Sequence, residues 1–257
     1  YLADKEGTLP PYRRFVNATG LDNPYLSEAY IENLRRTLTT SEVNRLLLGN
    51  WESQDDPDNL VSSDDILEMY DHSIEVNEDY TRYISADIAF KQDGCVLFVW
   101  EGNTVIDIVK VGRDEIVLDR IKEVAREYEI QTRHITYDSD GVGQYIKQYL
   151  RTAKAIINNG KVLKNENYVN LKTQLYYKLG ELIRDGKIKI KTNKFKKELE
   201  GELLCIKRKV RGTTESKQEI NSKADQKKLI GHSPDYADAM AYKMIFEYTK
   251  GNFTRTF

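Results

Sequence analysis

Residues 81–111, TRYISADIAFKQDGCVLFVWEGNTVIDIVKV, decide the fold. Three runs in this stretch are rich in β-branched and aromatic residues, and short polar turns at 91–94 and 102–103 separate them. Runs of this composition joined by short turns are typical of antiparallel strands. We therefore expect a three-stranded meander with strands over residues 83–90, 95–101 and 104–111.

The chain after the meander alternates between helical and strand-like patterns. An amphipathic pattern predicts a helix over 114–128, and further helices are expected over 141–150, 168–184 and 234–248. Strand-like runs are found at 133–137, 153–157, 187–191, 203–210 and 215–220. The order β-β-β-α-β-α-β-α predicts an α/β fold with a mixed central sheet and helices on both faces, the order of the RNase H-like superfold. An actin-like ATPase fold begins with the same order and stays open at this point.

The first part of the chain has a different sequence pattern. Residues 1–78 lack strand-like alternation and contain turn-forming residues. Helical spacing predicts helices over 27–38, with Ser27 as the N-cap, and over 41–48. We therefore expect residues 1–78 to form an interdomain linker with a lid-like helical segment, and residues 79–257 to form the RNase H-like domain.

Bulk properties exclude several classes of protein. The 257 residues are 40% hydrophobic and 31% charged, which is ordinary for a globular protein. No apolar run is long enough to span a membrane, and residues 1–11 do not have the pattern of a signal peptide. The two cysteines, Cys95 and Cys205, have no Cys or His nearby at metal-ligand spacing and indicate ordinary thiols.

The charge is uneven along the chain. The net charge is −2, so a polycation argument for nucleic acid fails for the whole chain. Between residues 184 and 211, however, there are eleven Lys or Arg and four Asp or Glu. Such a stretch suits phosphate binding, and equally a solvated surface.

Four acidic residues fall where the predicted elements end or begin. Asp87 lies inside an apolar strand, where a carboxylate is costly unless it is paired or binds a cation. Asp138 follows the strand at 133–137, at the edge where α/β sheets usually place their sites. Asp235 and Asp238 lie three residues apart after Pro234, so both belong on one face of the first helical turns.

Carboxylates from separate elements have a chemical use together. Hard divalent cations take oxygen ligands, and two of them can activate water and stabilise the leaving oxygen of a phosphodiester. Each acid also has a simpler explanation: Asp87 as half of a buried ion pair, Asp138 as a helix cap, Asp235 as a first-turn acid and Asp140 as a turn residue. Only their combination favours a metal site.

These motifs resemble a known family. The segment 231–239, GHSPDYADA, is similar to the SPD-x-ADA signature near the end of the large subunits of DNA-packaging terminases of tailed bacteriophages. The strand around Asp87 and the turn 137–143, YDSDGVG, resemble that family's first and second acidic motifs. Residues 22–26, DNPYL, and 47–51, LLGNW, look like the segment that joins the packaging ATPase to the nuclease.

The resemblance implies a metal-dependent endonuclease. Asp87, Asp138 and Asp238 would be the catalytic, metal-binding residues for two divalent ions, Mg²⁺ or Mn²⁺, with Asp235 as an accessory metal ligand. The substrate would be concatemeric viral double-stranded DNA, cut with little sequence preference at the start and end of genome packaging. A hairpin of 203–210 and 215–220 would border the DNA groove, and the lysines at 187, 189 and 191 would share one strand face. The residues expected to bind the DNA backbone are Lys187, Lys189, Lys191, Lys194, Lys196, Lys197, Lys207, Lys209 and Arg211.

The resemblance also implies partners and a location. In the full-length protein these would be the portal protein and the small terminase subunit, in the cytoplasm of the host cell and with no membrane. The P-loop pattern of the packaging ATPase does not occur in this sequence, so we expect a C-terminal fragment that cuts DNA without translocating it. Two alternatives remain: an actin-like phosphotransferase, and a non-catalytic module that docks DNA or the portal.

Overall fold

The computed structural model describes residues 58–71, 80–88, 95–112, 114–140, 143–209 and 216–249, with shorter pieces among the first 57 residues. The chain divides into two compact units, Tyr1–Pro57 and Asp58–Phe257. This division falls earlier than the boundary expected at residue 78. The reason is that Leu60, Ile66 and Met69, which the sequence placed in the linker, are buried in the core of the second unit.

The first unit contains a short 3₁₀ helix, η1 (Gly20–Asp22), and the helix α2 (Glu28–Thr37). α2 agrees with the helix predicted over 27–38, and the Ser27 hydroxyl accepts a hydrogen bond from the Tyr30 amide, as expected of a cap. The helix predicted over 41–48 lies outside the described residues, apart from Leu47.

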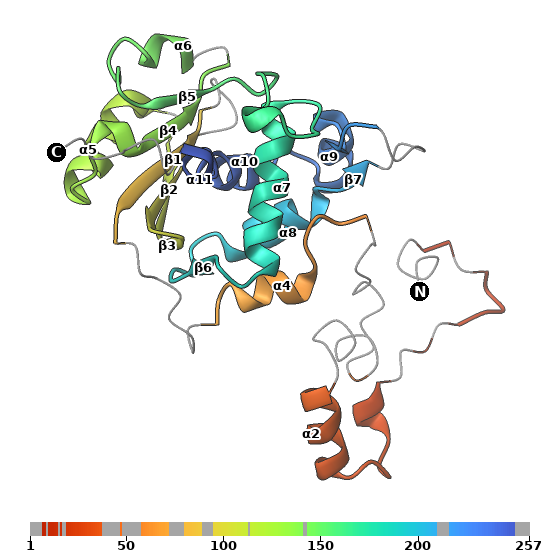
Figure 1. Cartoon of the computed structure of the whole chain (residues 1–257). Helices are drawn as coiled ribbons and strands as arrows, with labels where there is room; N and C mark the ends of the chain where they lie inside the picture. Colours follow the sequence, from red (N-terminus) through yellow and green to blue (C-terminus); the bar gives the residue numbers. More distant parts are fainter. Residues whose placement is uncertain are drawn as a thin grey trace. The chain divides into compact units, whose positions relative to one another are not determined.

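A six-stranded mixed sheet forms the centre of the second unit, in the order β5-β4-β1-β2-β3-β6 (Figure 1). β1, β2 and β3 form the predicted antiparallel meander, whereas β4 and β5 extend the sheet from β1 in parallel. β6 pairs in parallel with the far side of β3. The strands are β1 (Arg82–Asp87), β2 (Cys95–Glu101), β3 (Thr104–Val111), β4 (Ile135–Asp138), β5 (Lys154–Ile156) and β6 (Lys189–Ile190).

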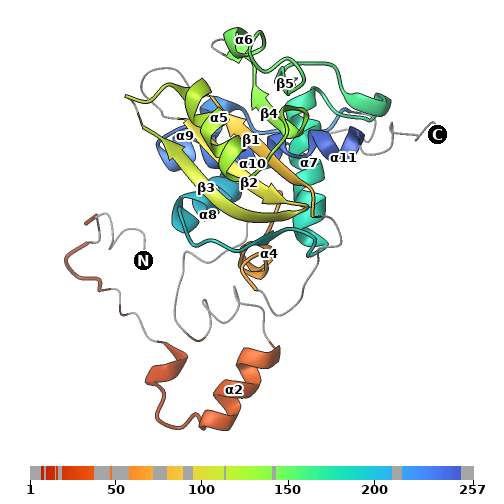
Figure 2. The ribbon, with the colours of Figure 1, turned by 90° about the vertical axis from the view of Figure 1, so that its left-hand side faces the viewer.

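Helices cover both faces of the sheet, as Figure 2 shows with α5 in front of the strands and α7 and α10 behind them. Residues of β2 alternate between the two cores: Leu97 packs on the α5 side, and Phe98 on the side of α7 and α10. This period of two follows from strand geometry. The helices of this unit are α4 (Ser63–Glu68), α5 (Val117–Glu127), α6 (Gly143–Ile146), α7 (Leu171–Arg184), α8 (Lys196–Cys205), α9 (Lys223–Ile230), α10 (Asp235–Tyr242) and α11 (Ile245–Thr249).

The region after β6 differs from the prediction. The strand expected over 203–210 is wrong in its first part, because α8 continues to Cys205 and buries Leu199 and Leu203 one helical turn apart. Only β7 (Arg208–Lys209) remains of that strand, and it pairs antiparallel with β8 (Glu219–Ile220). The expected pairing of these two segments is therefore confirmed with shorter strands, and residues 210–215 between them lie outside the description.

The long helix α7 begins later than predicted. Asn170 has extended backbone, and its Oδ1 accepts a 2.9 Å hydrogen bond from the Thr173 amide, so the helix begins at Leu171 and not at residue 168. Within the described part of the chain, no helix has both the length and the apolar character needed to cross a bilayer.

Candidate functional site

Two of the predicted acids lie at the same edge of the sheet. β1 and β4 are parallel, and their register pairs Ala86 with Tyr137, so the next residues, Asp87 and Asp138, are neighbours at the C-terminal ends of these strands. Ala86 and Tyr137 pack on the α5 side of the sheet. By strand alternation Asp87 and Asp138 lie on the opposite side, the side of α10.

α10 supplies the other two predicted acids. It packs against β1, β2 and β4, and it carries Asp235 and Asp238 in its first turn. Asp238 is 1% exposed and Asp87 is 5% exposed, while Asp235 and Asp138 are half-buried. Carboxylates from β1, β4 and α10 therefore gather at one edge of the sheet.

Asp238 is held by two residues of α7. The Lys172 ammonium lies 2.6 Å from Oδ1 and 2.7 Å from Oδ2 of Asp238, so it contacts both carboxylate oxygens. The Tyr176 hydroxyl, one turn further along α7, donates a 2.5 Å hydrogen bond to Oδ1. These contacts compensate a buried negative charge, which would otherwise be costly.

Asp138 has a separate set of partners. Its Oδ1 accepts from the Asp140 amide at 2.8 Å, and its Oδ2 accepts from Asn158 Nδ2 at 3.2 Å. The Tyr242 hydroxyl lies 3.1 Å from Asn158 Oδ1. Asp140 Oδ2 in turn accepts a 3.1 Å hydrogen bond from the Asn158 amide, 18 residues further along the chain. Asn158 follows β5, the next parallel strand, so three adjacent strand ends contribute to this edge.

The N-terminus of α10 is fixed by a residue from another helix. Pro234, which precedes α10, provides no side-chain cap. Instead, Glu202 of α8 accepts hydrogen bonds from the amides of Tyr236 and Ala237 at 2.7 and 2.9 Å. Glu202 is 1% exposed. It thus satisfies two of the otherwise unpaired amides of the helix that carries Asp235 and Asp238.

The electrostatics of the edge reflect crowded, buried acids. Burial and the nearby charges of Asp238 and Asp235 raise the pKa of Asp87 well above its usual value. Burial also raises the pKa of Asp138, and it raises that of Glu202 to about 8. Burial opposes the charge of Lys172, but the Asp238 carboxylate outweighs it and the pKa of Lys172 is raised. Lys172 therefore stays charged beside the acids.

The acids fit a divalent cation by chemistry, because hard cations take carboxylate oxygens. Among the described residues, however, no three His, Cys, Asp or Glu side chains lie close enough to hold one ion. Lys172 and Asn158 hold Asp238 and Asp138 individually. The carboxylates are therefore the right kind of ligand for a divalent cation, and they are buried as such ligands usually are. Side chains, above all Lys172, would have to move before these carboxylates could contact one ion.

The lysines of the basic stretch do not form one patch beside the acids. Lys189 pairs with Thr104, the first residue of β3. Asp87, the last residue of β1, pairs with Val96 near the start of β2. Lys189 and Asp87 therefore lie at opposite ends of the strands. Lys189 is also 5% exposed, and its ammonium donates to the Glu68 carbonyl. The burial of Lys189 does not support its expected contact with DNA, and the DNA-binding roles of Lys187, Lys189 and Lys191 stay predictions. The short β6 contains only the middle lysine of the three.

The other residues predicted to bind DNA differ in exposure and in the groups that they contact. Lys187 and Lys194 are exposed and paired with Asp185 and Asp107, while Lys191 and Lys197 are exposed. Lys196 is half-buried over the Tyr70 ring. Lys207 and Lys209 belong to the β7–β8 region, and Arg211 lies outside the described residues.

Sequence reasoning missed several residues of this edge. Asn158 follows a predicted strand, so the rule that identified Asp138 could also have identified Asn158. Lys172, Tyr176 and Glu202 contact the acids or α10 only through the tertiary fold, and no local pattern marks them.

Comparison with solved structures identifies the fold. The chain superposes on the nuclease domain of the large terminase subunit of bacterial virus Sf6 with a TM-score of 0.62 and 18% sequence identity, over 72% of this chain and 98% of that one. Its fold is that of a terminase nuclease domain. The RNase H-like architecture expected from the element order is thereby confirmed, and the choice between the two folds that this order left open is decided.

Two further Sf6 structures give the same picture of the terminase nuclease fold. A mutant of that domain solved with manganese, and one solved with calcium, each match with a TM-score of 0.62 and 17% identity over 72% of this chain and 98% of theirs. No protein-family model and no curated protein matches the sequence.

Proposed function

We propose that this chain is a metal-dependent DNA endonuclease that cuts concatemeric viral double-stranded DNA during genome packaging, with little sequence preference. Asp87, Asp138 and Asp238 hold two divalent ions, Mg²⁺ or Mn²⁺, with Asp235 as an accessory ligand. The portal protein and the small terminase subunit are its partners in the host cytoplasm. Manganese in a structure of the Sf6 domain supports the choice of ion.

One observation carries the proposal: the buried carboxylates of Asp87 and Asp238 and the half-buried carboxylate of Asp138 lie at one sheet edge, where Lys172 pairs with Asp238. Asp87 and Asp238 are 5% and 1% exposed, and burial and the charge of Asp238 raise the pKa of Asp87. Burying several acids together lowers stability unless a cation offsets their repulsion. A purely structural edge would contain apolar residues or paired charges in equal number.

The chain's own groups have distinct tasks in this proposal. Divalent ions, when bound, lower the pKa of a water and stabilise the leaving oxygen of a phosphodiester. Asp87 and Asp138 provide oxygens from two rigid strand ends, and Asp238 provides them from α10. Glu202 holds the start of α10, so that Asp235 and Asp238 keep their position relative to β1. Lys172 neutralises Asp238 in the metal-free protein, the role that a bound cation would otherwise have.

Plasmid cleavage tests the proposal. Supercoiled plasmid is incubated with the protein in Mn²⁺, in Mg²⁺ and in EDTA, alongside Asp87→Asn, Asp138→Asn and Asp238→Asn. We expect nicking and linearisation with either ion, none in EDTA, and a loss of at least about 100-fold in each variant. Asp107→Asn, an acid on the meander outside this edge, is the control and keeps full activity.

The alternatives give different outcomes in the same experiment. Turnover of ATP without nicking would favour a phosphotransferase. Binding of plasmid without cleavage in either ion would favour a non-catalytic docking module. Either result would contradict the nuclease assignment.

A further inference from the structure

A polar hollow adjoins the acidic edge. It has a volume of about 310 Å³ and lies between the end of β5, the start of α7, β8 and the start of α9. Asn158 and Lys172 line it, and the same two side chains bond Asp138 and Asp238. The hollow therefore continues directly from the site proposed to hold the scissile phosphate.

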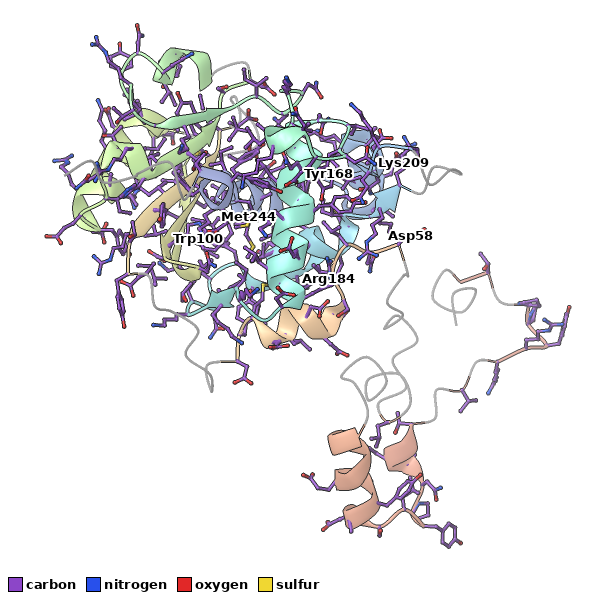
Figure 3. The ribbon with its side chains drawn as sticks, viewed as in Figure 1. Asp58, Trp100, Tyr168, Arg184, Lys209 and Met244 are labelled. Carbon is purple, nitrogen blue, oxygen red and sulfur yellow. The ribbon has the colours of Figure 1, made fainter. Side chains whose placement is uncertain are left out.

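The segments around the hollow are joined through β8. Tyr168, before α7, forms a parallel bridge with Gln218, before β8, and β8 pairs with β7. Figure 3 labels Tyr168 and Lys209, which lie on the side of α7 where β7 and α9 are found. Residues far apart in sequence thus enclose this space within one compact unit.

The lining consists mainly of groups that both donate and accept hydrogen bonds. Four asparagines line the hollow, with Thr173, Ser222 and Gln226. Val169 and Ile220 supply apolar surface, Lys223 supplies an exposed positive charge, and Glu219, which is paired with Lys209, supplies a negative one. A primary amide has both a carbonyl oxygen and an amino group, as the edges of nucleobases do. The amides of Asn158, Asn170 and Asn221 already make hydrogen bonds within the protein, so a ligand would use their remaining donor and acceptor positions. The asparagines are Asn158, Asn159, Asn170 and Asn221.

One lining residue is incompletely satisfied. Gln226 is 1% exposed, and its Nε2 donates to the carbonyl oxygen and to Oδ1 of Asn221 at 2.9 and 3.2 Å. These two bonds fix the orientation of the amide. No group among the described residues donates to its Oε1, which is also buried. A buried acceptor without a donor is costly, and Oε1 has almost no accessible surface, so a ligand N–H or O–H group would reach it only after a side-chain movement.

We infer that this hollow binds a single nucleotide of the DNA strand, next to the phosphate held at the acidic edge. The inference rests on the proposed nuclease function. Amides contact the base edge, Val169 and Ile220 contact its apolar surface, and Lys223 meets the adjoining phosphate. A volume of about 310 Å³ is at the small end of ligand sites and suits one nucleotide better than a duplex. The nucleotide is therefore unpaired when it enters.

Binding in EDTA tests the inference without any cleavage. The probe is a short fluorescein-labelled single-stranded oligo-dT. Asn159→Phe fills the hollow, and Lys223→Glu reverses the charge at its rim. Asn193→Phe and Lys227→Glu make the same changes at exposed positions outside it, the second on the same helix. We expect Kd to rise about tenfold in the first two variants and less than about twofold in the controls. Thermal melts verify that all four variants fold.

A second readout locates the ligand. In ¹⁵N-labelled protein the side-chain amide signals of Gln226 should shift on addition of oligo-dT, and also on addition of free deoxythymidine monophosphate if a lone nucleotide suffices. Shifts with either ligand support the hollow as the site. Signals unmoved by both ligands, or equal Kd values in all four variants, would overturn the inference. If only the nuclease proposal is wrong, the wild-type protein shows no metal-dependent cleavage, while the Kd changes and the Gln226 shifts are still observed.

Discussion

The Lys172 ammonium lies 2.6 and 2.7 Å from the two carboxylate oxygens of Asp238, although 66 residues separate them in the sequence. Asp238 is almost fully buried, and Lys172 is 15% exposed. Lys172 therefore occupies the place of a cation among acids that otherwise repel one another. The stability of this edge should depend on which cation is present.

Replacing Lys172 by Met should destabilise the protein in EDTA by about 3 kcal/mol, because a buried carboxylate loses its counter-charge. Mn²⁺ should restore more stability to this variant than it adds to the wild type. Urea unfolding with and without Mn²⁺ measures both effects. Lys178→Met, on the same helix but in an exposed pair with Glu181, is the control and should cost less than about 1 kcal/mol. Equal responses of the two variants to Mn²⁺ would contradict this role of Lys172.

Replacing Asp87 by Asn should stabilise the metal-free protein. Burial and neighbouring acids raise the pKa of Asp87, so its charged form is disfavoured in the folded state. A neutral amide removes that penalty and should add about 1 kcal/mol. Asp107 is the opposite case: its bonds from Lys194 and Tyr128 outweigh burial and lower its pKa, so Asp107→Asn should lower stability. Urea unfolding in EDTA at neutral pH compares the two variants, and shifts of the same sign would refute the prediction.

Glu202 predicts a pH dependence. Burial raises its pKa from 4.5 to about 8, so between these values the folded state binds a proton that the unfolded state releases. Its contribution to stability is therefore present at low pH and lost as pH rises toward 8. Glu202→Gln keeps an acceptor for the amides of Tyr236 and Ala237 but does not titrate. Its melting temperature relative to the wild type should rise between about pH 5 and pH 8. Parallel pH profiles would show that Glu202 does not titrate in this range.

The β7–β8 region should contribute more to DNA binding than the start of the basic stretch. Arg208 and Lys209 are exposed on β7, whose partner β8 lines the hollow beside the acids. Charge reversal at both positions should weaken binding of duplex DNA and reduce the salt slope by about 1 to 2. Lys187→Glu, near β6, should leave both nearly unchanged. A larger effect from Lys187 would place the DNA at the opposite end of the sheet.

The sequence revealed those parts of the site that local patterns encode. Asp87 interrupts an apolar strand, Asp138 follows one, and Asp238 lies in the first turn of the helix after Pro234, so each was visible from its neighbours. Lys172 and Glu202 were not visible in this way, because their partners lie 66 and 34 or more residues away and no local spacing indicates such contacts. The burial of Lys189 was not visible from the sequence for a related reason: alternation was assumed over five residues, but β6 is two residues long.

The binding of metal ions at the acidic edge is tested most directly by anomalous diffraction from crystals soaked in Mn²⁺. We expect two manganese peaks among the carboxylates of Asp87, Asp138 and Asp238, with the Lys172 ammonium displaced from Asp238. Crystals with no peak at this edge, and with the Lys172–Asp238 pair intact at saturating Mn²⁺, would contradict this expectation.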